Sequence, residues 1–190
     1  MQTRTSLTTR LRTLVACALL AVALTALAPS PASAANCPGA YANPNSASTA
    51  TVRDATLCLV NAERRQRGMR NLRHNGRLAE AATRHASDMV RRDYFSHESP
   101  GGADMLDRIL RTDYIRASTS SWTVAENIAW GSDSLATPIS IVRMWMGSSG
   151  HRANILNRRF EEIGIGIVRG APRGGVRNAA TYVNNFGARG

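Results

Sequence analysis

The sequence contains no lysine, and all 24 of its basic residues are arginine. Against 13 acidic residues they give a formal net charge of +11, while aromatic residues make up only 5% of the chain. Single-stranded nucleic acid is bound by a basic groove interleaved with aromatic side chains, whereas these arginines are spread along the sequence. The composition therefore disfavours nucleic acid as a partner. It favours adhesion to anionic surfaces such as cell-wall polymers or acidic lipids.

Long hydrophobic runs are also absent beyond the first 35 residues, so we expect no transmembrane anchor. Before that point, three arginines precede an apolar stretch, Leu14–Leu27, and Ala32-Ser33-Ala34 has the small residues of a signal-peptide cleavage site. We therefore predict that residues 1–35 are a secretory signal. The mature protein would be extracellular and monomeric, and loss of the three arginines would leave it with a net charge of +8.

Cysteine is scarce, with three residues in the whole chain, one of them in the predicted signal. The remaining pair, Cys37 and Cys58, is predicted to form a disulfide, because exported proteins mature in an oxidising compartment. The bridge would close a loop of roughly 20 residues and contribute about 3 kcal/mol by restricting the unfolded chain. The alternative is two free thiols. The spacing does not match a redox-active Cys-x-x-Cys motif.

The rest of the chain is predicted to be one domain, residues 51–188, preceded by a flexible arm at residues 36–50 that is rich in turn-forming residues. Apolar residues recur at helical spacing early in the domain and alternate as in strands near its end, which indicates an α+β fold. The expected helices run from Thr51 to a stop at Gly68, over Gly76–Arg92 and Ala103–Leu110, and from Thr137-Pro138 to a break at Ser148-Ser149-Gly150. The expected strands, forming a hairpin, are Glu162–Val168 and Ala180–Phe186.

Three polar residues lie at turns or helix edges and are flanked by apolar or aromatic residues: His97, Glu126 and His151. Two imidazoles and one carboxylate are a sufficient ligand set for a divalent metal that keeps an open position for water. The alternative is a hydrogen-bonded strut between loops. His85 falls on the apolar face of its helix and is interpreted as a core histidine, and His74 is interpreted as structural.

Five segments carry a resemblance to a known family. In order they are LVNAERRQRGMRNLRHNGRLAEAATRHASDMVRRDYFSH, AENIAWG, MWMGSSGHRANILN, EEIGIGIV and YVNNFG, spanning Leu57 to Gly187. With them the chain resembles the CAP superfamily (cysteine-rich secretory proteins, antigen 5 and pathogenesis-related proteins) in its short bacterial, SCP-like form. The resemblance implies a three-layer α-β-α sandwich with a small central antiparallel sheet.

The family's cleft is lined by two histidines and two glutamates. The resemblance carries this role over to His97, His151 and Glu126 as ligands of a possible divalent metal, with zinc favoured and calcium or magnesium as alternatives. Ser148 stands where longer members have the second glutamate, so one carboxylate is missing. Trp145 and Asn127 are expected to line the cleft beside Ser148.

The leading functional hypothesis is a secreted bacterial binding module for cell-wall or lipid ligands. The first alternative is a metal-assisted hydrolase in which Glu126, the candidate catalytic residue, acts as the base. The missing carboxylate disfavours it, and the chain has neither a His-Glu-x-x-His helix nor a Gly-x-Ser-x-Gly elbow. The second alternative is a structural polar network without metal. The sequence therefore favours a binding module over an enzyme and leaves the hydrolase open as an alternative.

Overall fold

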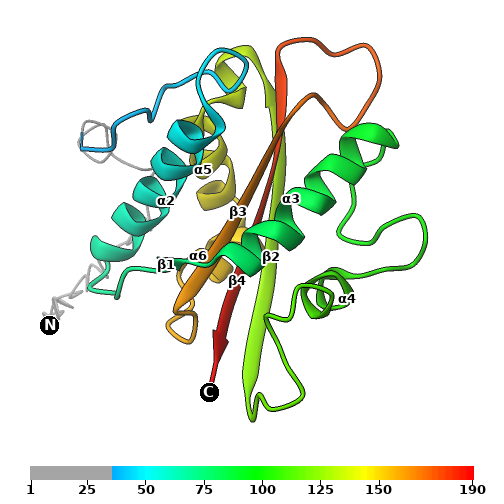
Figure 1. The fold of residues 1–190 in the computed structure, drawn as a ribbon. Helices are drawn as coiled ribbons and strands as arrows, with labels where there is room; N and C mark the ends of the chain where they lie inside the picture. The colour runs from blue at the N-terminus through cyan, green and yellow to red at the C-terminus, as the bar shows by residue number, and fades with distance from the viewer. Residues whose placement is uncertain (1–35) are drawn as a thin grey trace, which may run out of the picture.

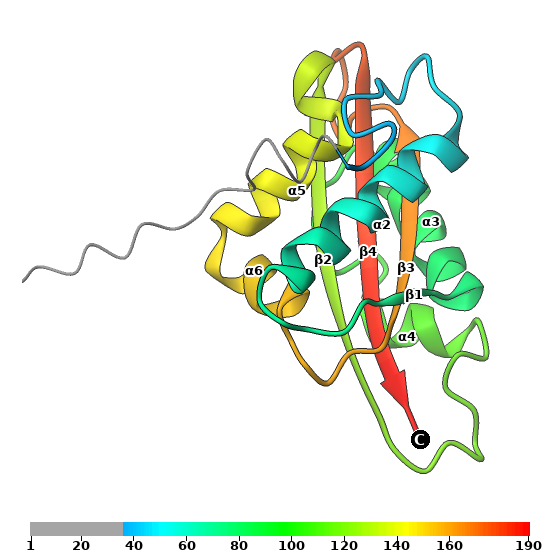
Figure 2. The same cartoon turned by 90° about the vertical axis from the view of Figure 1, so that its left-hand side faces the viewer.

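A four-stranded sheet lies between two layers of helices in the computed structural model, which describes residues 36–190 (Figure 1). The predicted secretory signal lies outside the described residues. Helices α2 (Thr49–Arg65), α5 (Pro138–Gly147) and α6 (Ser149–Ile155) cover one face of the sheet, and α3 (Gly76–Arg91) and α4 (Met105–Leu110) cover the other (Figure 2). The predicted α+β fold with three layers, α-β-α, is confirmed.

The sheet has the strand order β1-β3-β4-β2, and a short 3-10 helix, Asp133–Ala136, follows β2. The long strands β2, β4 and β3 are antiparallel, whereas the short β1 runs parallel to β3. The predicted hairpin of β3 and β4 is confirmed, and the sheet as a whole is mixed. The strand bounds are β1 Arg73–His74, β2 Trp122–Ser132, β3 Glu162–Arg169 and β4 Ala179–Arg189.

Strand β2 corrects the expectation that Glu126 lies in a loop or at a helix edge. Residues 127–129 are all buried, whereas a strand with one exposed face would alternate buried and exposed residues. The sequence here therefore lacks the alternation of apolar and polar residues that predicts a strand. The strand forms because β2 pairs with β4 over its whole length, from Trp122 opposite Arg189 to Ser132 opposite Ala179. Glu126 is thereby held on a rigid edge strand.

The glycines of β3 allow α3 to pack closely on the sheet. The isoleucines of this strand are buried on the α2 side, while Gly164 and Gly166 face α3. A Cβ atom on Gly164 would overlap the backbone of α3 at Leu78 and Ala79. Glycine within a strand permits this close approach of another backbone.

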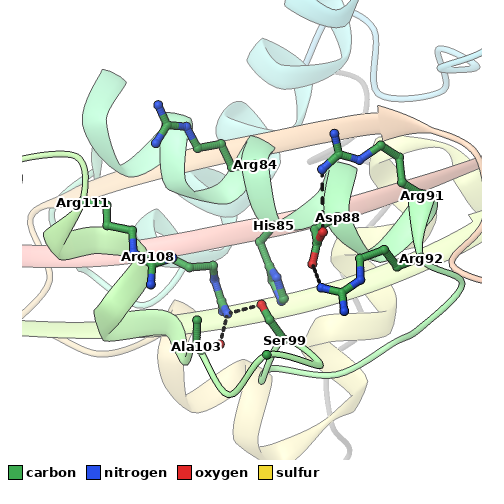
Figure 3. Close-up of a pocket in the computed structure, with 10 residues that line it drawn as sticks. Arg84, His85, Asp88, Arg91, Arg92, Ser99, Ala103, Arg108 and Arg111 are labelled. Carbon is green, nitrogen blue, oxygen red and sulfur yellow. Dashed lines mark hydrogen bonds and ion pairs between the residues drawn. The ribbon is translucent and has the colours of Figure 1, made fainter.

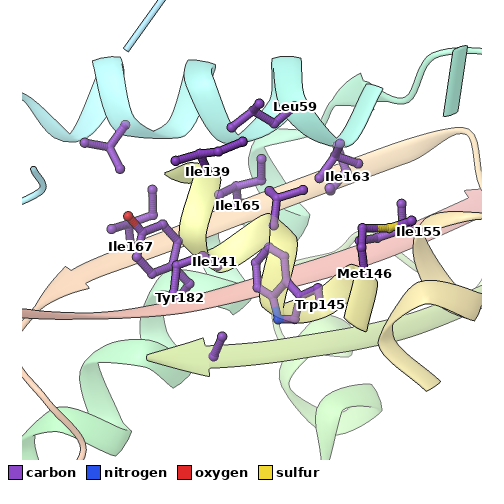
Figure 4. Close-up of a cluster of buried hydrophobic side chains, with 14 of the residues drawn as sticks. Leu59, Ile139, Ile141, Trp145, Met146, Ile155, Ile163, Ile165, Ile167 and Tyr182 are labelled. Atoms are coloured by element: carbon purple, nitrogen blue, oxygen red, sulfur yellow. The ribbon is translucent and has the colours of Figure 1, made fainter. Parts of the chain in front are cut away.

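The largest apolar cluster fills the space between the sheet and α2, α5 and α6, and we call it the apolar face (Figure 4). At its centre Trp145 is fully buried and donates its indole N–H to the carbonyl of Ile128 over 3.1 Å. Its other prominent members are Leu59, Ile139, Ile141, Met146, Ile155, Ile163, Ile165, Ile167, Tyr182 and Phe186.

The segment before α2 is tied to the domain. Cys37 and Cys58 form the predicted disulfide, with 5.7 Å between their Cα atoms. The carbonyl of Ala40 accepts a hydrogen bond from the backbone N–H of Ile139, and that of Pro44 accepts one from Arg169. The segment predicted to be a flexible arm therefore packs against both helical and strand elements.

Side-chain caps set the helix starts on the α3 side. Asn75 accepts hydrogen bonds from the N–H groups of Arg77 and Leu78, and Asp104 and Asp107 form a reciprocal capping box at α4. The predicted break after α5 occurs at Ser148, but the chain resumes at once as α6, which was not predicted. No helix within residues 36–190 is long and apolar enough to cross a membrane.

Candidate functional site

Glu126 is the centre of a buried group of polar side chains on the α3 side of the sheet. Its side chain is 2% exposed. Arg108 on α4 donates from Nη2 to both carboxylate oxygens, over 3.1 Å to Oε1 and 3.0 Å to Oε2. His97, in the loop between α3 and α4, is 2.9 Å from Oε1 through its Nδ1. The structure thus brings two of the three predicted ligands, His97 and Glu126, into direct contact.

Two further side chains complete the surroundings of Glu126. With its amide nitrogen facing the carboxylate, Asn185 of β4 donates to Oε2 over 3.1 Å and accepts from the N–H of Ala82 over 3.2 Å. His85 of α3 lies 3.9 Å from Oε1. A carboxylate offers about four lone-pair sites, and Arg108, His97 and Asn185 occupy them. We call Glu126 and these four side chains the polar network.

His97 is oriented by this contact. An ionised carboxylate only accepts hydrogen bonds, so Nδ1 of His97 carries the proton and a neutral ring has its lone pair on Nε2. The side chain is 56% exposed, so the ring faces solvent in part. It borders a small hollow of about 350 Å³ that also includes Glu98 and Asp104.

Arg108 fixes the loop that carries His97. It is 7% exposed and donates to the carbonyls of His97 and Ala103, over 2.9 Å each. Among the described residues its Nε finds no acceptor. Sequence analysis missed this residue, and the only available signal was an arginine beside Ile109 on the inward side of a short helix. Arg108 therefore supplies the positive charge that balances the buried carboxylate of Glu126.

His85 is a buried histidine, as predicted, but it is also part of the polar network. Its side chain is inaccessible, and Nε2 lies 2.9 Å from the carbonyl of Ser96. Burial, above all, lowers the pKa of His85. The charge of Glu126 acts in the opposite direction, and the charge of Arg108 lowers the pKa further by a smaller amount. The ring is therefore neutral at pH 7 and donates to the loop.

His151 approaches from the opposite side of the sheet. Adjacent residues of a strand point to opposite faces, so Asn127 faces α6, where it donates to the carbonyl of His151 over 3.0 Å and accepts from Asn154 over 2.9 Å. Burial lowers the pKa of His151, and so does the positive charge of His97. The two imidazoles are therefore within electrostatic reach of each other around the edge strand.

The predicted metal site remains a prediction. Among residues 36–190 no group of three or more His, Cys, Asp or Glu side chains is arranged to hold a metal ion. A metal on Glu126 would have to displace Arg108, His97 or Asn185 from its oxygens. A metal on Nε2 of His97, shared with His151, would need no such displacement, since Glu126 would then orient the ligand from behind.

The residues expected to line the cleft have other positions. Trp145 is 0% exposed and lies in the apolar core, so the expectation that it lines the cleft is corrected. Asn127 is also fully buried, where it links β2 to α6. Ser148 is half-buried at the junction of α5 and α6, and its backbone N–H bonds the carbonyl of Trp145.

Comparison with known proteins agrees with this architecture. The sequence model of the cysteine-rich secretory protein family, CAP, matches residues 57–186. The chain belongs to this family. The match includes His97, Glu126 and His151 as well as all four strands except the last three residues of β4.

Two proteins of Bacillus subtilis are similar to this CAP domain in sequence. One, named as the uncharacterized protein YkwD, is 38% identical over 110 residues, which cover 58% of this chain and 40% of that protein. The other, named as the uncharacterized membrane protein YlbC, is 30% identical over 113 residues, 60% of this chain and 30% of that protein. The chain thus matches less than half the length of either relative.

Solved structures show the same fold. An extracellular protein containing an SCP domain from Bacillus anthracis superposes with a TM-score of 0.57 at 25% identity, over 74% of this chain and 43% of that one. An outer surface protein of Borrelia burgdorferi superposes with a TM-score of 0.62 at 19% identity, over 76% and 97% of the two chains. The bacterial SCP-like form of the CAP family is therefore the form that this chain takes.

Proposed function

We propose that this CAP-domain protein is exported and binds cell-wall material or a lipid at the hollow beside His97 and Glu126, which we call the cleft. His151 lies beyond the edge strand β2. Export is supported by the signal-like pattern of residues 1–35 and by the extracellular location given for the similar SCP-domain protein of Bacillus anthracis. The observation that carries the binding role is the saturation of Glu126 by hydrogen-bond donors.

A general base needs a lone pair that faces the proton it removes. The lone pairs of Glu126 face Arg108, His97 and Asn185, so none is left for a substrate or an attacking water. The carboxylate instead fixes the loop and aligns His97. The cleft then offers a ligand one oriented imidazole and the backbone around it, which suits recognition better than hydrolysis.

Retention on cell material tests the binding role. The purified protein and its His97→Ala variant are incubated with isolated cell walls and, separately, with phospholipid vesicles, and the bound fraction is measured after sedimentation. We expect His97→Ala to reduce retention on one of these materials by about tenfold, the loss of one charge-assisted or two neutral hydrogen bonds. His74→Ala, which removes an exposed histidine outside the cleft, is the matched control.

Equal retention of the wild type and of His97→Ala on walls and on vesicles would contradict the proposal. So would a loss that is equal for His74→Ala and His97→Ala. A circular dichroism spectrum for each variant separates loss of binding from loss of folding.

A second candidate is the metal-assisted hydrolase, favoured by one observation. A buried carboxylate that orients an exposed imidazole is the arrangement found in many general bases and metal ligands. If this candidate is correct, zinc binds the protein at His97 and His151, and hydrolysis of a peptide or ester panel disappears in both His97→Ala and Glu126→Gln. Zinc binding is measured by calorimetry, so it is detected even if no substrate is cleaved.

A further inference from the structure

A hollow outside the cleft is lined by ten residues, five of which are arginine. Its volume is about 460 Å³, and it lies between α3 and the segment that leads through the Ser99–Ala103 turn into α4 (Figure 3). We call it the arginine hollow. Its arginines are Arg84, Arg91, Arg92, Arg108 and Arg111, and Asp88 is the only acidic residue in its lining.

The spacing along the two helices explains how arginines from both come to line the hollow. Arg84, Asp88 and Arg91 are separated by four and then three residues, which places them on one face of α3. Arg108 and Arg111 are three residues apart at the end of α4 and form the opposite wall. The exposed face of α3, beside the face that buries His85, therefore carries two cations along the rim of the hollow.

Most of this positive charge is available to a ligand. Asp88 is shared by Arg91 at 3.6 Å and Arg92 at 3.5 Å and also accepts a hydrogen bond from Tyr94. These are long, exposed ion pairs of the kind that contribute little. Arg111 has no ion pair or side-chain hydrogen bond with another residue of the described chain. Arg108 is committed to Glu126, and Arg84 forms an exposed ion pair with Glu80. Arg111 and the weakly paired Arg91 and Arg92 therefore supply the most readily available donors.

We propose that the arginine hollow binds the phosphate groups of a soluble phosphodiester polymer. Guanidinium groups present paired N–H donors that match the oxygens of phosphate. A carboxylate has two oxygens in one plane, whereas the tetrahedral oxygens of a phosphate point in several directions. A phosphate can therefore be held from both walls at once.

The length of the site favours a polymer over a single phosphate. Arg84 and Arg91 are seven residues apart, about 10 Å along the helix axis, so the rim can contact successive phosphates of one chain. No Phe, Tyr or Trp lines this part of the described structure, so stacking of nucleic-acid bases is not provided for. The hollow is concave, which suits a flexible chain better than a flat membrane.

The test uses a fluorescently labelled glycerol phosphate oligomer and measures its affinity by anisotropy at several salt concentrations. Arg91→Gln/Arg111→Gln removes one exposed guanidinium from each wall, and Arg65→Gln/Arg143→Gln removes the same charge from α2 and α5 on the other face of the sheet. We expect the first variant to bind at least about tenfold more weakly and the second to stay within about twofold of the wild type. The salt dependence of the first should weaken by about one unit of slope for each arginine removed.

No binding of the oligomer by the wild type would overturn the inference at once, and so would any of three further results. The first is an equal loss in both double variants, which would mean that net charge alone attracts the oligomer. The second is equally tight binding of a polyglutamate of similar charge, which would remove the preference for phosphate. The third is tighter, arginine-dependent binding to vesicles of anionic phospholipid, which would make a membrane surface the source of the phosphate.

The inference does not depend on the role proposed for the cleft. Wall or vesicle retention of His97→Ala reports on the cleft, and oligomer binding by Arg91→Gln/Arg111→Gln reports on the arginine hollow. Either result can fail while the other holds.

Discussion

The two faces of the sheet bury different kinds of side chains. Towards α2, α5 and α6 the strands present large apolar side chains that pack on Trp145. Towards α3 and α4 they present Gly164, Gly166 and the carboxylate of Glu126, and the apolar clusters there are smaller. Hydrophobic burial is not directional, whereas a buried carboxylate requires specific donors. The apolar face should therefore supply stability, and the polar network should supply a defined geometry.

This division explains where the candidate sites lie. The glycines of β3 let α3 approach the sheet, which brings His85 to within 3.9 Å of Glu126. The polar network then fixes the loop between α3 and α4, and the cleft at His97 and the arginine hollow both open beside that loop. The α3 and α4 side of the sheet buries less apolar surface and more polar contacts, and both candidate ligand sites lie on this side.

The largest expected effect is on the apolar face. Trp145→Ala should lower the free energy of unfolding by about 5 kcal/mol, because it leaves a large cavity and removes the donor to the carbonyl of Ile128. Urea unfolding followed by circular dichroism measures the change. Trp122→Ala, at a tryptophan that is 45% exposed, is the matched control and should cost far less. Similar losses for the two would contradict the assignment of Trp145 to the core.

Next in size is the loss of Arg108 from the polar network. Arg108→Met should cost about 4 kcal/mol, because it leaves the carboxylate of Glu126 buried without its cation. Adding Glu126→Gln removes the uncompensated charge, so the double variant should be more stable than Arg108→Met alone. A double-mutant cycle in urea measures the coupling. Additive losses would show that the two side chains do not depend on each other.

Much of the secondary structure could be predicted from the sequence, and much of the polar network could not. Helical periodicity predicts α3 almost to the residue, and the alternation of apolar residues predicts the strand β3. The polar network is made by residues distant in sequence, with Arg108 and Asn185 separated by 77 positions. No local pattern marks either one, because their partner is set by the tertiary fold.

The site prediction was divided for a related physical reason. Glu126 and Asn127 are neighbours in sequence, but a strand sends them to opposite faces. Glu126 therefore meets His97, while Asn127 meets the backbone of His151. A loop at this position gives no reason to separate the two, so the sequence analysis grouped His151 with His97 and Glu126. The contact of His151 with the opposite side of the strand emerged only with β2.

A smaller effect is expected from the covalent tie on the α2 side. Replacing Cys37 and Cys58 together by serine should lower the free energy of unfolding by about 3 kcal/mol, mainly by releasing a restriction on the unfolded chain, since the loop spans 21 residues. Thermal unfolding with and without a reductant measures this. The polar network is remote from the bridge, so binding at the arginine hollow should persist in the folded variant, and its loss would show that the two sides are coupled.

The smallest expected effect is a pH dependence that belongs to the polar network. The pKa of His85 is lowered in the folded protein, mainly by burial, from an ordinary value of 6.5. Below that value the unfolded chain takes up a proton that the folded protein refuses, so stability should fall as the pH drops below about 6.5 and stay level above it. His151 should contribute with the same sign, since burial and the charge of His97 lower its pKa as well.

Urea midpoints at about pH 7.5 and about pH 5.5 measure this dependence. His85→Gln keeps a donor for the carbonyl of Ser96 but cannot titrate, so the drop between the two pH values should become smaller. Trp145→Ala should be less stable at both pH values with the drop unchanged, because no titrating group is lost from the apolar face. If His85→Gln leaves the drop intact, the buried imidazole is not its source, and the contrast between the two faces of the sheet would not extend to their response to acid.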